Sequence, residues 1–118
     1  RKIVNIFQPD VMYMGGLTKA LKVAKIIEKG GFICTPHTAN LSLVTICTMH
    51  FLKAINNSGP YLEFSIEGKD YYPWQQNLFL GDPFKISNGT VKIEDTPGWG
   101  IEINPDWLDK SEYKKTEI

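Results

Sequence analysis

The sequence has 118 residues, a formal net charge of zero, 42% hydrophobic and 22% charged residues, which is the composition of an ordinary soluble globular protein. Its 13 Lys and Arg residues balance 13 Asp and Glu residues without a dense basic cluster, so we expect no nucleic-acid partner. No apolar run approaches the roughly 20 residues that span a bilayer, and the amino terminus lacks a signal-peptide pattern. We therefore expect no membrane partner and a cytoplasmic location.

The first part of the chain has the pattern of a parallel βα unit. A short run rich in Ile, Val and Phe predicts a buried strand over about residues 3–9. Gly15-Gly16 supply a turn, and the helix that follows is predicted to end at Gly30-Gly31. A bare Gly-Gly is too weak a signal for a phosphate loop. The apolar residues of this helix recur at helical spacing: Leu17, Ala20, Leu21, Ala24 and Ile27.

A second unit follows with a strand over about residues 32–35 and a helix over roughly 42–56. Asn40 or Ser42 can cap the start of this helix. Its apolar residues lie nearly all round, which indicates burial on more than one side. We therefore predict a larger or homo-oligomeric protein, with His50 as a core or interface residue of the helix.

A turn cluster over residues 56–60 precedes a third predicted strand, residues 61–66. The order strand, helix, strand, helix, strand predicts an α/β fold with parallel strands. Asp10, His37 and Glu63 lie at nearly equal intervals, where each apolar segment runs out. Because parallel strands place their carboxyl ends on one side of a sheet, these three polar groups should converge. Glu67 is a rival to Glu63, since alternation puts both on the same side of the strand.

From residue 68 the sequence becomes rich in aromatic residues, Pro and Gly, which predicts short strands and ordered loops rather than helices. Asn88-Gly89 predicts a hairpin turn. We interpret residues 68–118 as an arm that lies across another part of the protein, with the aromatic residues between Tyr71 and Phe84 serving packing rather than sugar stacking. Cys34 and Cys47 are predicted to be buried free thiols.

Five short motifs stand at the predicted strand ends, at the start of the first helix and in the Gly-rich and Pro-rich tail. They are Gln8-Pro9-Asp10, Gly15-Gly16-Leu17-Thr18-Lys19-Ala20-Leu21-Lys22, Thr35-Pro36-His37, Leu62-Glu63 and Asp95-Thr96-Pro97-Gly98-Trp99-Gly100-Ile101. In order and spacing they resemble the carboxyl-terminal part of a mandelate racemase/muconate lactonizing enzyme of the enolase superfamily.

The resemblance implies a modified TIM barrel, of which residues 1–67 would supply the sixth, seventh and eighth strands. Residues 68–118 would return to an amino-terminal capping domain. A closed barrel needs about 250 residues, and this chain begins at Arg1, not Met. We therefore expect a carboxyl-terminal piece of a longer protein.

The resemblance also implies a chemistry, the removal of a proton next to a carboxylate with the help of Mg²⁺. His37 would be the base and Asp10 its orienting partner, while Glu63, if protonated, would donate a hydrogen bond to the substrate oxyanion. No metal ligand is expected in this chain, because the family's ligands lie on the third, fourth and fifth strands. The substrate would be a small carboxylate.

Three functions remain open from the sequence. The first is a magnesium-dependent acid-sugar dehydratase, a lyase that forms a 2-keto-3-deoxy acid. The second is a racemase or epimerase of a 2-hydroxy acid, which would use an upstream lysine on the opposite face of the substrate. The third, from another class, is a non-catalytic fragment or interaction domain whose exposed strand edges are covered by another chain.

Overall fold

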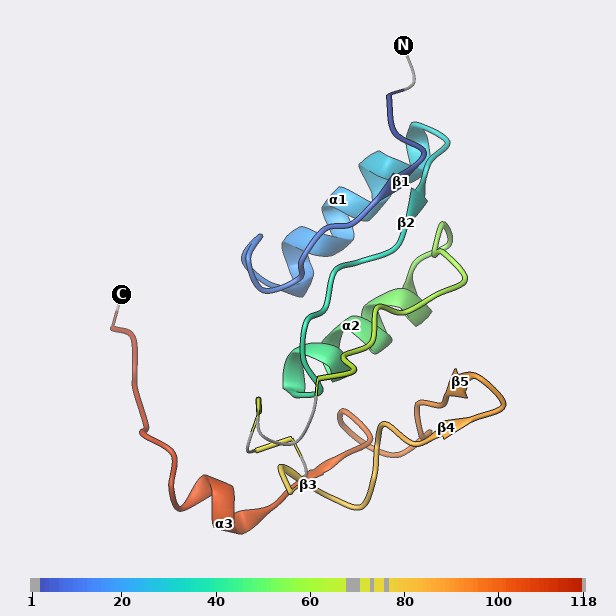
Figure 1. Cartoon of the computed structure of the whole chain (residues 1–118). Coiled ribbons are helices and arrows are strands. Elements are labelled where there is room, and N and C mark those ends of the chain that lie inside the picture. The colour runs from blue at the N-terminus through green and yellow to red at the C-terminus, as the bar shows by residue number, and fades with distance from the viewer. Residues whose placement is uncertain (1–2, 68–70, 73, 76, 118) are drawn as a thin grey trace. The chain divides into compact units, whose positions relative to one another are not determined.

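The computed structural model describes residues 3–67, 71–72, 74–75 and 77–117. The chain divides into two compact units, Arg1–Gly68 and Lys69–Ile118. Figure 1 shows helices and strands alternating in the first unit and short strands with one short helix in the second. The boundary predicted at residue 68 lies outside the described residues. Within the described part of the chain, no helix is long and apolar enough to cross a membrane.

A parallel strand pair organises the first unit. Strand β1 (Ile6–Phe7) pairs with β2 (Ile33–Cys34), with Ile6 opposite Ile33 and Phe7 opposite Cys34. The predicted parallel arrangement is therefore confirmed, although both strands are shorter than predicted.

The burial expected for the first strand is wrong. Ile3, Val4 and Ile6 expose 87%, 47% and 52% of their surface, because within the described residues β1 has a partner strand on one side only. The sheet does not close into a barrel in the described part of this chain.

Helix α1 (Leu17–Lys29) connects the two strands and confirms the predicted helix. Its buried residues, Ala20, Ala24 and Ile27, lie on one face, as the spacing of apolar positions requires. Gly30 caps its carboxyl end, and Gly31 follows with a φ of 72°, a left-handed conformation that favours glycine.

Helix α2 (Leu43–Ala54) begins after Ser42, whose hydroxyl accepts a hydrogen bond from the Val44 amide at 3.2 Å. This confirms one of the two predicted caps. His50 is half-buried, while Leu43 is 41% exposed. Two of the buried residues of the helix are threonines. The buried residues are Thr45, Ile46, Thr48, Met49 and Phe51.

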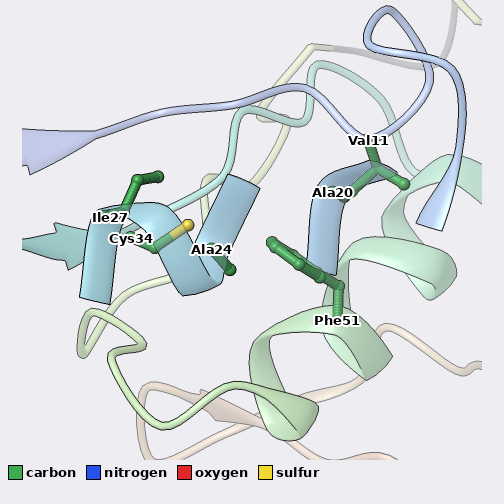
Figure 2. Close-up of a cluster of buried hydrophobic side chains, with 6 residues drawn as sticks. All are labelled: Val11, Ala20, Ala24, Ile27, Cys34 and Phe51. Atoms are coloured by element: carbon green, nitrogen blue, oxygen red, sulfur yellow. The ribbon is translucent and has the colours of Figure 1, made fainter. Parts of the chain in front are cut away.

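The core of the first unit joins both helices to β2. Figure 2 shows Phe51 extending from α2 toward α1, and Cys34 of β2 close to α1. Cys34 is buried, Cys47 is half-buried, and both are free thiols whose pKa is raised by burial. The core consists of Val11, Ala20, Ala24, Ile27, Cys34 and Phe51.

The third predicted strand, residues 61–66, is wrong, because the structure has no strand there. The parallel ladder beside β2 is a single bridge between Cys34 and Ser58, in which the Cys34 amide donates to Asn57 O and the Gly59 amide donates to Cys34 O, both at 2.9 Å. The next bond of this ladder would need an N–H at position 36, two residues after Cys34, and Pro36 has none to donate, so the ladder ends.

The second unit contains two antiparallel pairs. Strand β3 (Phe79–Leu80) pairs with β6 (Glu102–Ile103), and β4 (Ile86–Ser87) pairs with β5 (Thr90–Val91). Asn88 and Gly89 have φ values of 50° and 73°, so the predicted hairpin turn is confirmed.

The expectation that the second unit has no helix is wrong for one turn, α3 (Pro105–Leu108). The Asn104 side chain caps it by accepting from the Asp106 amide at 3.1 Å, and Pro105 stands at the first helical position. Ring contacts between Tyr71 and Tyr72 at 4.7 Å and between Phe79 and Phe84 at 5.7 Å support the predicted packing role of the aromatic residues.

Candidate active site

The β1–β2 pairing places Asp10 and His37 at the same edge of the first unit. Beyond the strands, the Thr35 amide donates to Phe7 O at 2.9 Å and the His37 amide donates to Pro9 O at 3.2 Å. Asp10 and His37 then form an isolated parallel bridge. Two residues far apart in sequence are thus brought opposite each other by backbone pairing.

Asp10 is held by three donors. One carboxylate oxygen, Oδ1, accepts the amides of Met12 and Tyr13 at 2.8 Å each, and the other, Oδ2, lies 2.7 Å from His37 Nδ1. Burial by itself raises the pKa of Asp10, but the hydrogen bonds from Tyr13, His37 and Met12 outweigh it, so the pKa lies below the ordinary value of 3.8. Asp10 is therefore a carboxylate at neutral pH.

The charge of Asp10 fixes the tautomer of neutral His37. A carboxylate has no proton to donate, so Nδ1 must carry the hydrogen and donate it to Asp10 Oδ2. The lone pair of the ring is then on Nε2. The side chain of His37 is 39% exposed, against 13% for Asp10. The pair therefore consists of a half-buried carboxylate and a more accessible imidazole that can accept a proton.

Glu63 completes the group that the sequence predicted. The Thr38 amide donates to Glu63 Oε2 at 2.9 Å, and this same oxygen lies 4.0 Å from His37 Nε2. A separation of 4.0 Å is too long for a hydrogen bond. Among the described residues, neither the second oxygen of Glu63 nor Nε2 of His37 makes a hydrogen bond, so both can interact with a third group.

Glu67, the rival carboxylate, is not part of this arrangement. It is fully exposed and accepts a hydrogen bond from the Ser65 hydroxyl, which lowers its pKa. None of its hydrogen bonds or ion pairs within the described residues reaches Asp10 or His37.

Two residues at the site were missed by the sequence interpretation. The hydroxyls of Thr38 and Thr45 lie 2.9 Å apart, and the two residues are 1% and 0% exposed. A threonine inside an otherwise apolar helix was the available signal, because a buried hydroxyl needs a partner.

The described residues offer no set of ligands for a metal ion. Nowhere in the described ranges do three or more His, Cys, Asp or Glu residues gather in a way that could hold one. Both oxygens of Asp10 are also already engaged by hydrogen bonds. Asp10, His37 and Glu63 therefore do not fit the role of a Mg²⁺ site.

Comparison with known proteins identifies the family. Residues 1–107 match the family described as enolase C-terminal domain-like. The chain belongs to the enolase superfamily, in its mandelate racemase/muconate lactonizing branch. This enolase-superfamily chain spans only about a quarter to a third of the length of the relatives it matches.

Two curated relatives show the range of activities among similar proteins. The chain is 29% identical over 105 residues to L-rhamnonate dehydratase from Saccharopolyspora erythraea, a match that covers 86% of this chain and 25% of that protein. It is 32% identical over 112 residues to D-galactarolactone cycloisomerase from Agrobacterium fabrum, covering 89% and 29%.

Solved structures share the fold of this enolase-superfamily chain. A protein from Roseobacter denitrificans, provisionally named a racemase, is 53% identical with a TM-score of 0.89, covering 98% of this chain and 31% of that one. An enolase from Mycobacterium smegmatis complexed with tartrate is 25% identical with a TM-score of 0.70, covering 91% and 25%. A mandelate racemase/muconate lactonizing protein from Paracoccus denitrificans, complexed with magnesium, is 24% identical with a TM-score of 0.75, covering 91% and 28%.

Proposed function

We propose that in the full-length protein His37 removes the proton next to the carboxylate of a sugar acid, and that loss of the 3-hydroxyl gives a 2-keto-3-deoxy acid. The observation that carries the proposal is the 2.7 Å contact between His37 Nδ1 and Asp10 Oδ2, which leaves the lone pair of His37 on its accessible nitrogen. An oriented neutral imidazole is a suitable general base at neutral pH.

In this proposal His37 acts twice on one substrate, first as a base and then as an acid, while Asp10 stabilises its charge. His37 Nε2 takes the proton from carbon 2, and the positive charge that forms on the ring is stabilised by the Asp10 carboxylate 2.7 Å away. The same proton then passes from Nε2 to the departing hydroxyl of carbon 3, which leaves as water. The remaining enol becomes the 2-keto acid, so atoms and charges balance without an oxidant or reductant.

Glu63 would stabilise the negative charge that develops on the substrate. If it is protonated, the oxygen that does not accept the Thr38 amide is free to donate a hydrogen bond to the substrate oxyanion. In this proposal Asp10 and His37 follow the sixth and seventh strands of a modified TIM barrel, and Glu63 lies on the unpaired segment that takes the place of the eighth.

In this proposal the upstream sequence of the full-length protein would supply the Mg²⁺ ligands and the capping domain. The Paracoccus denitrificans protein was crystallised with magnesium and the Mycobacterium smegmatis protein with tartrate, a small dicarboxylate. Both support a full-length protein that binds a small carboxylate together with this ion. The second unit would pack as an arm against the capping domain.

A second candidate function is racemisation or epimerisation of a 2-hydroxy acid. It is favoured by the 53% identity to the Roseobacter denitrificans protein with a racemase name, whereas dehydration is favoured by the relatives named L-rhamnonate dehydratase. Both reactions begin with the same proton abstraction, so His37 has the same first role in each.

The proposal is tested by α-proton exchange in D₂O, followed by NMR, for the full-length protein with Mg²⁺ and a panel of sugar acids. His37→Asn should abolish exchange, while His50→Asn, which changes the other histidine of the chain on α2, should retain it. Retained exchange in His37→Asn would overturn the proposal. Product analysis separates the two reactions, because dehydration yields a keto acid and epimerisation an inverted hydroxy acid. Absence of exchange with the whole panel would favour the non-catalytic alternative.

A further inference from the structure

We propose that Thr45 of α2 is a positioning residue for the site, acting through a relay of hydrogen bonds that includes two buried threonine hydroxyls and ends on Glu63. The relay runs from Asn40 O through the hydroxyls of Thr45 and Thr38 to the Thr38 backbone, whose amide donates to Glu63. The hydrogen bonds themselves do not depend on the proposed function, but the kinetic arm of the test does.

The direction of the relay follows from the number of protons available. Asn40 O is a carbonyl and can only accept, so the single hydroxyl hydrogen of Thr45 is used in that bond. The 2.9 Å contact between the two hydroxyls must then be donated by Thr38 and accepted by Thr45. Each hydroxyl thus has one defined role.

The relay fixes the segment that carries His37. The His37 amide is bound to Pro9 O and its ring to Asp10, while the next residue, Thr38, is bound through its amide to Glu63 and through its hydroxyl to Thr45. The side-chain bond to α2 is the only one of these four that ties the segment to a helix. Its loss would leave the Thr38 amide, and with it Glu63 Oε2, less firmly placed.

Thr48 provides an internal comparison on the same helix. Like Thr45 it is 0% exposed, but its hydroxyl donates to Val44 O at 2.8 Å, within α2 itself. Replacing either threonine by valine removes one buried hydroxyl at nearly constant volume. Only the change at position 45 breaks a connection to the site.

The test uses the full-length protein and the variants Thr45→Val, Thr45→Ser and Thr48→Val. Hydrogen–deuterium exchange, resolved to the amide of residue 38, should be about tenfold faster in Thr45→Val, as expected for loss of one hydrogen bond. It should stay within about twofold of wild type in Thr48→Val, and Thr45→Ser should restore protection because it keeps the hydroxyl.

The kinetic arm should follow the same order. Thr45→Val should lower kcat for α-proton exchange by roughly 10- to 100-fold with a smaller change in KM, because a displaced group at the reacting centre affects the transition state most. Thr48→Val should leave kcat near wild type, and Thr45→Ser should recover most of it.

The two arms separate the failure of this inference from the failure of the proposed function. If no acid supports exchange, the proposed function fails, but amide protection at residue 38 still decides the inference. Unchanged protection in Thr45→Val, or an equal loss in Thr48→Val, would overturn it. Should Thr45→Val not fold, Thr38→Val breaks the same relay at its other end, and the amide at position 38 should show the same loss of protection.

Discussion

Asp10 Oδ2 lies 2.7 Å from His37 Nδ1, at the point where two parallel segments form their last backbone bridge. The other oxygen of Asp10 is committed to the amides of Met12 and Tyr13. Asp10 therefore cannot turn without losing two hydrogen bonds. This fixed orientation is what assigns the proton to Nδ1 and the lone pair to Nε2.

Asp10→Asn should place the imidazole in the wrong tautomer. The Met12 and Tyr13 amides need an acceptor, so the asparagine oxygen would stay with them and its NH₂ group would face His37 Nδ1. Nδ1 must then accept, and the proton moves to Nε2. We expect α-proton exchange to fall by about 10²- to 10⁴-fold.

The tautomer itself can be measured by ¹⁵N NMR of the histidine ring, independently of turnover. His50, the other histidine, serves as an internal reference in the same spectrum. Wild-type activity in Asp10→Asn, or an unchanged pattern of ring nitrogen shifts, would contradict the orienting role of Asp10.

The stability of the protein should depend on Asp10 in acid. Since its pKa in the folded state is below the ordinary 3.8, the carboxylate contributes stability that is fully present above 3.8 and is lost as the pH falls through the lowered value. The difference in thermal midpoint between wild type and Asp10→Asn should therefore be largest near neutral pH and shrink below 3.8. A difference that grows with acidification would refute this sign.

Substitutions of Glu63 can distinguish a hydrogen-bond donor from a charged group. Glu63→Gln keeps an oxygen to accept the Thr38 amide and adds an NH₂ that can donate to a substrate. If Glu63 acts as a neutral donor, this variant should lose only about tenfold in kcat, whereas Glu63→Ala should lose about 10²- to 10³-fold. Glu67→Gln, at the exposed carboxylate, is the control and should behave as wild type. Equal losses in the Gln and Ala variants would indicate that the charge of Glu63 is required.

The sequence was sufficient to place Asp10 and His37 together but not to describe Glu63 correctly. Period and spacing identify parallel βα units, and parallel strands bring their ends to one edge, which is how the first two residues meet. Glu63 was expected at the end of a strand. It lies instead on a segment without strand pairing, held by the Thr38 amide.

The missed features depend on contacts between segments. Apolar residues predicted a third strand over residues 61–66, but strand pairing needs backbone donors on the neighbouring segment, and Pro36 offers none at the position where the ladder beside β2 would continue. The relay between Thr38 and Thr45 depends on contact between the segment that follows His37 and the first turn of α2. Neither contact has a periodic signature in the sequence.

Gly59 lies where the segment that leads to Glu63 packs closely against β2, so a substitution there should affect both the stability of the protein and the site. Its amide donates to Cys34 O at 2.9 Å, and a Cβ at this position would overlap the Thr35 hydroxyl and lie 3.2 Å from Ile33 Cγ2. Gly59→Ala should therefore push the segment that leads to Glu63 away from β2. We expect a loss of about 1–3 kcal/mol in the free energy of unfolding, as for an overpacked core, together with a lower kcat.

Thr35, whose hydroxyl would overlap the new Cβ, provides the control for Gly59→Ala. Combining Gly59→Ala with Thr35→Ala removes the overlapping hydroxyl, so the double variant should be more stable than the sum of the two single effects predicts, and denaturant unfolding measures this coupling. Ser58→Ala, at the exposed neighbouring position, should change stability by less than about 0.5 kcal/mol. Additive effects of the two changes would mean that the Thr35 hydroxyl can move aside, and that glycine is not required for the approach of this segment to β2.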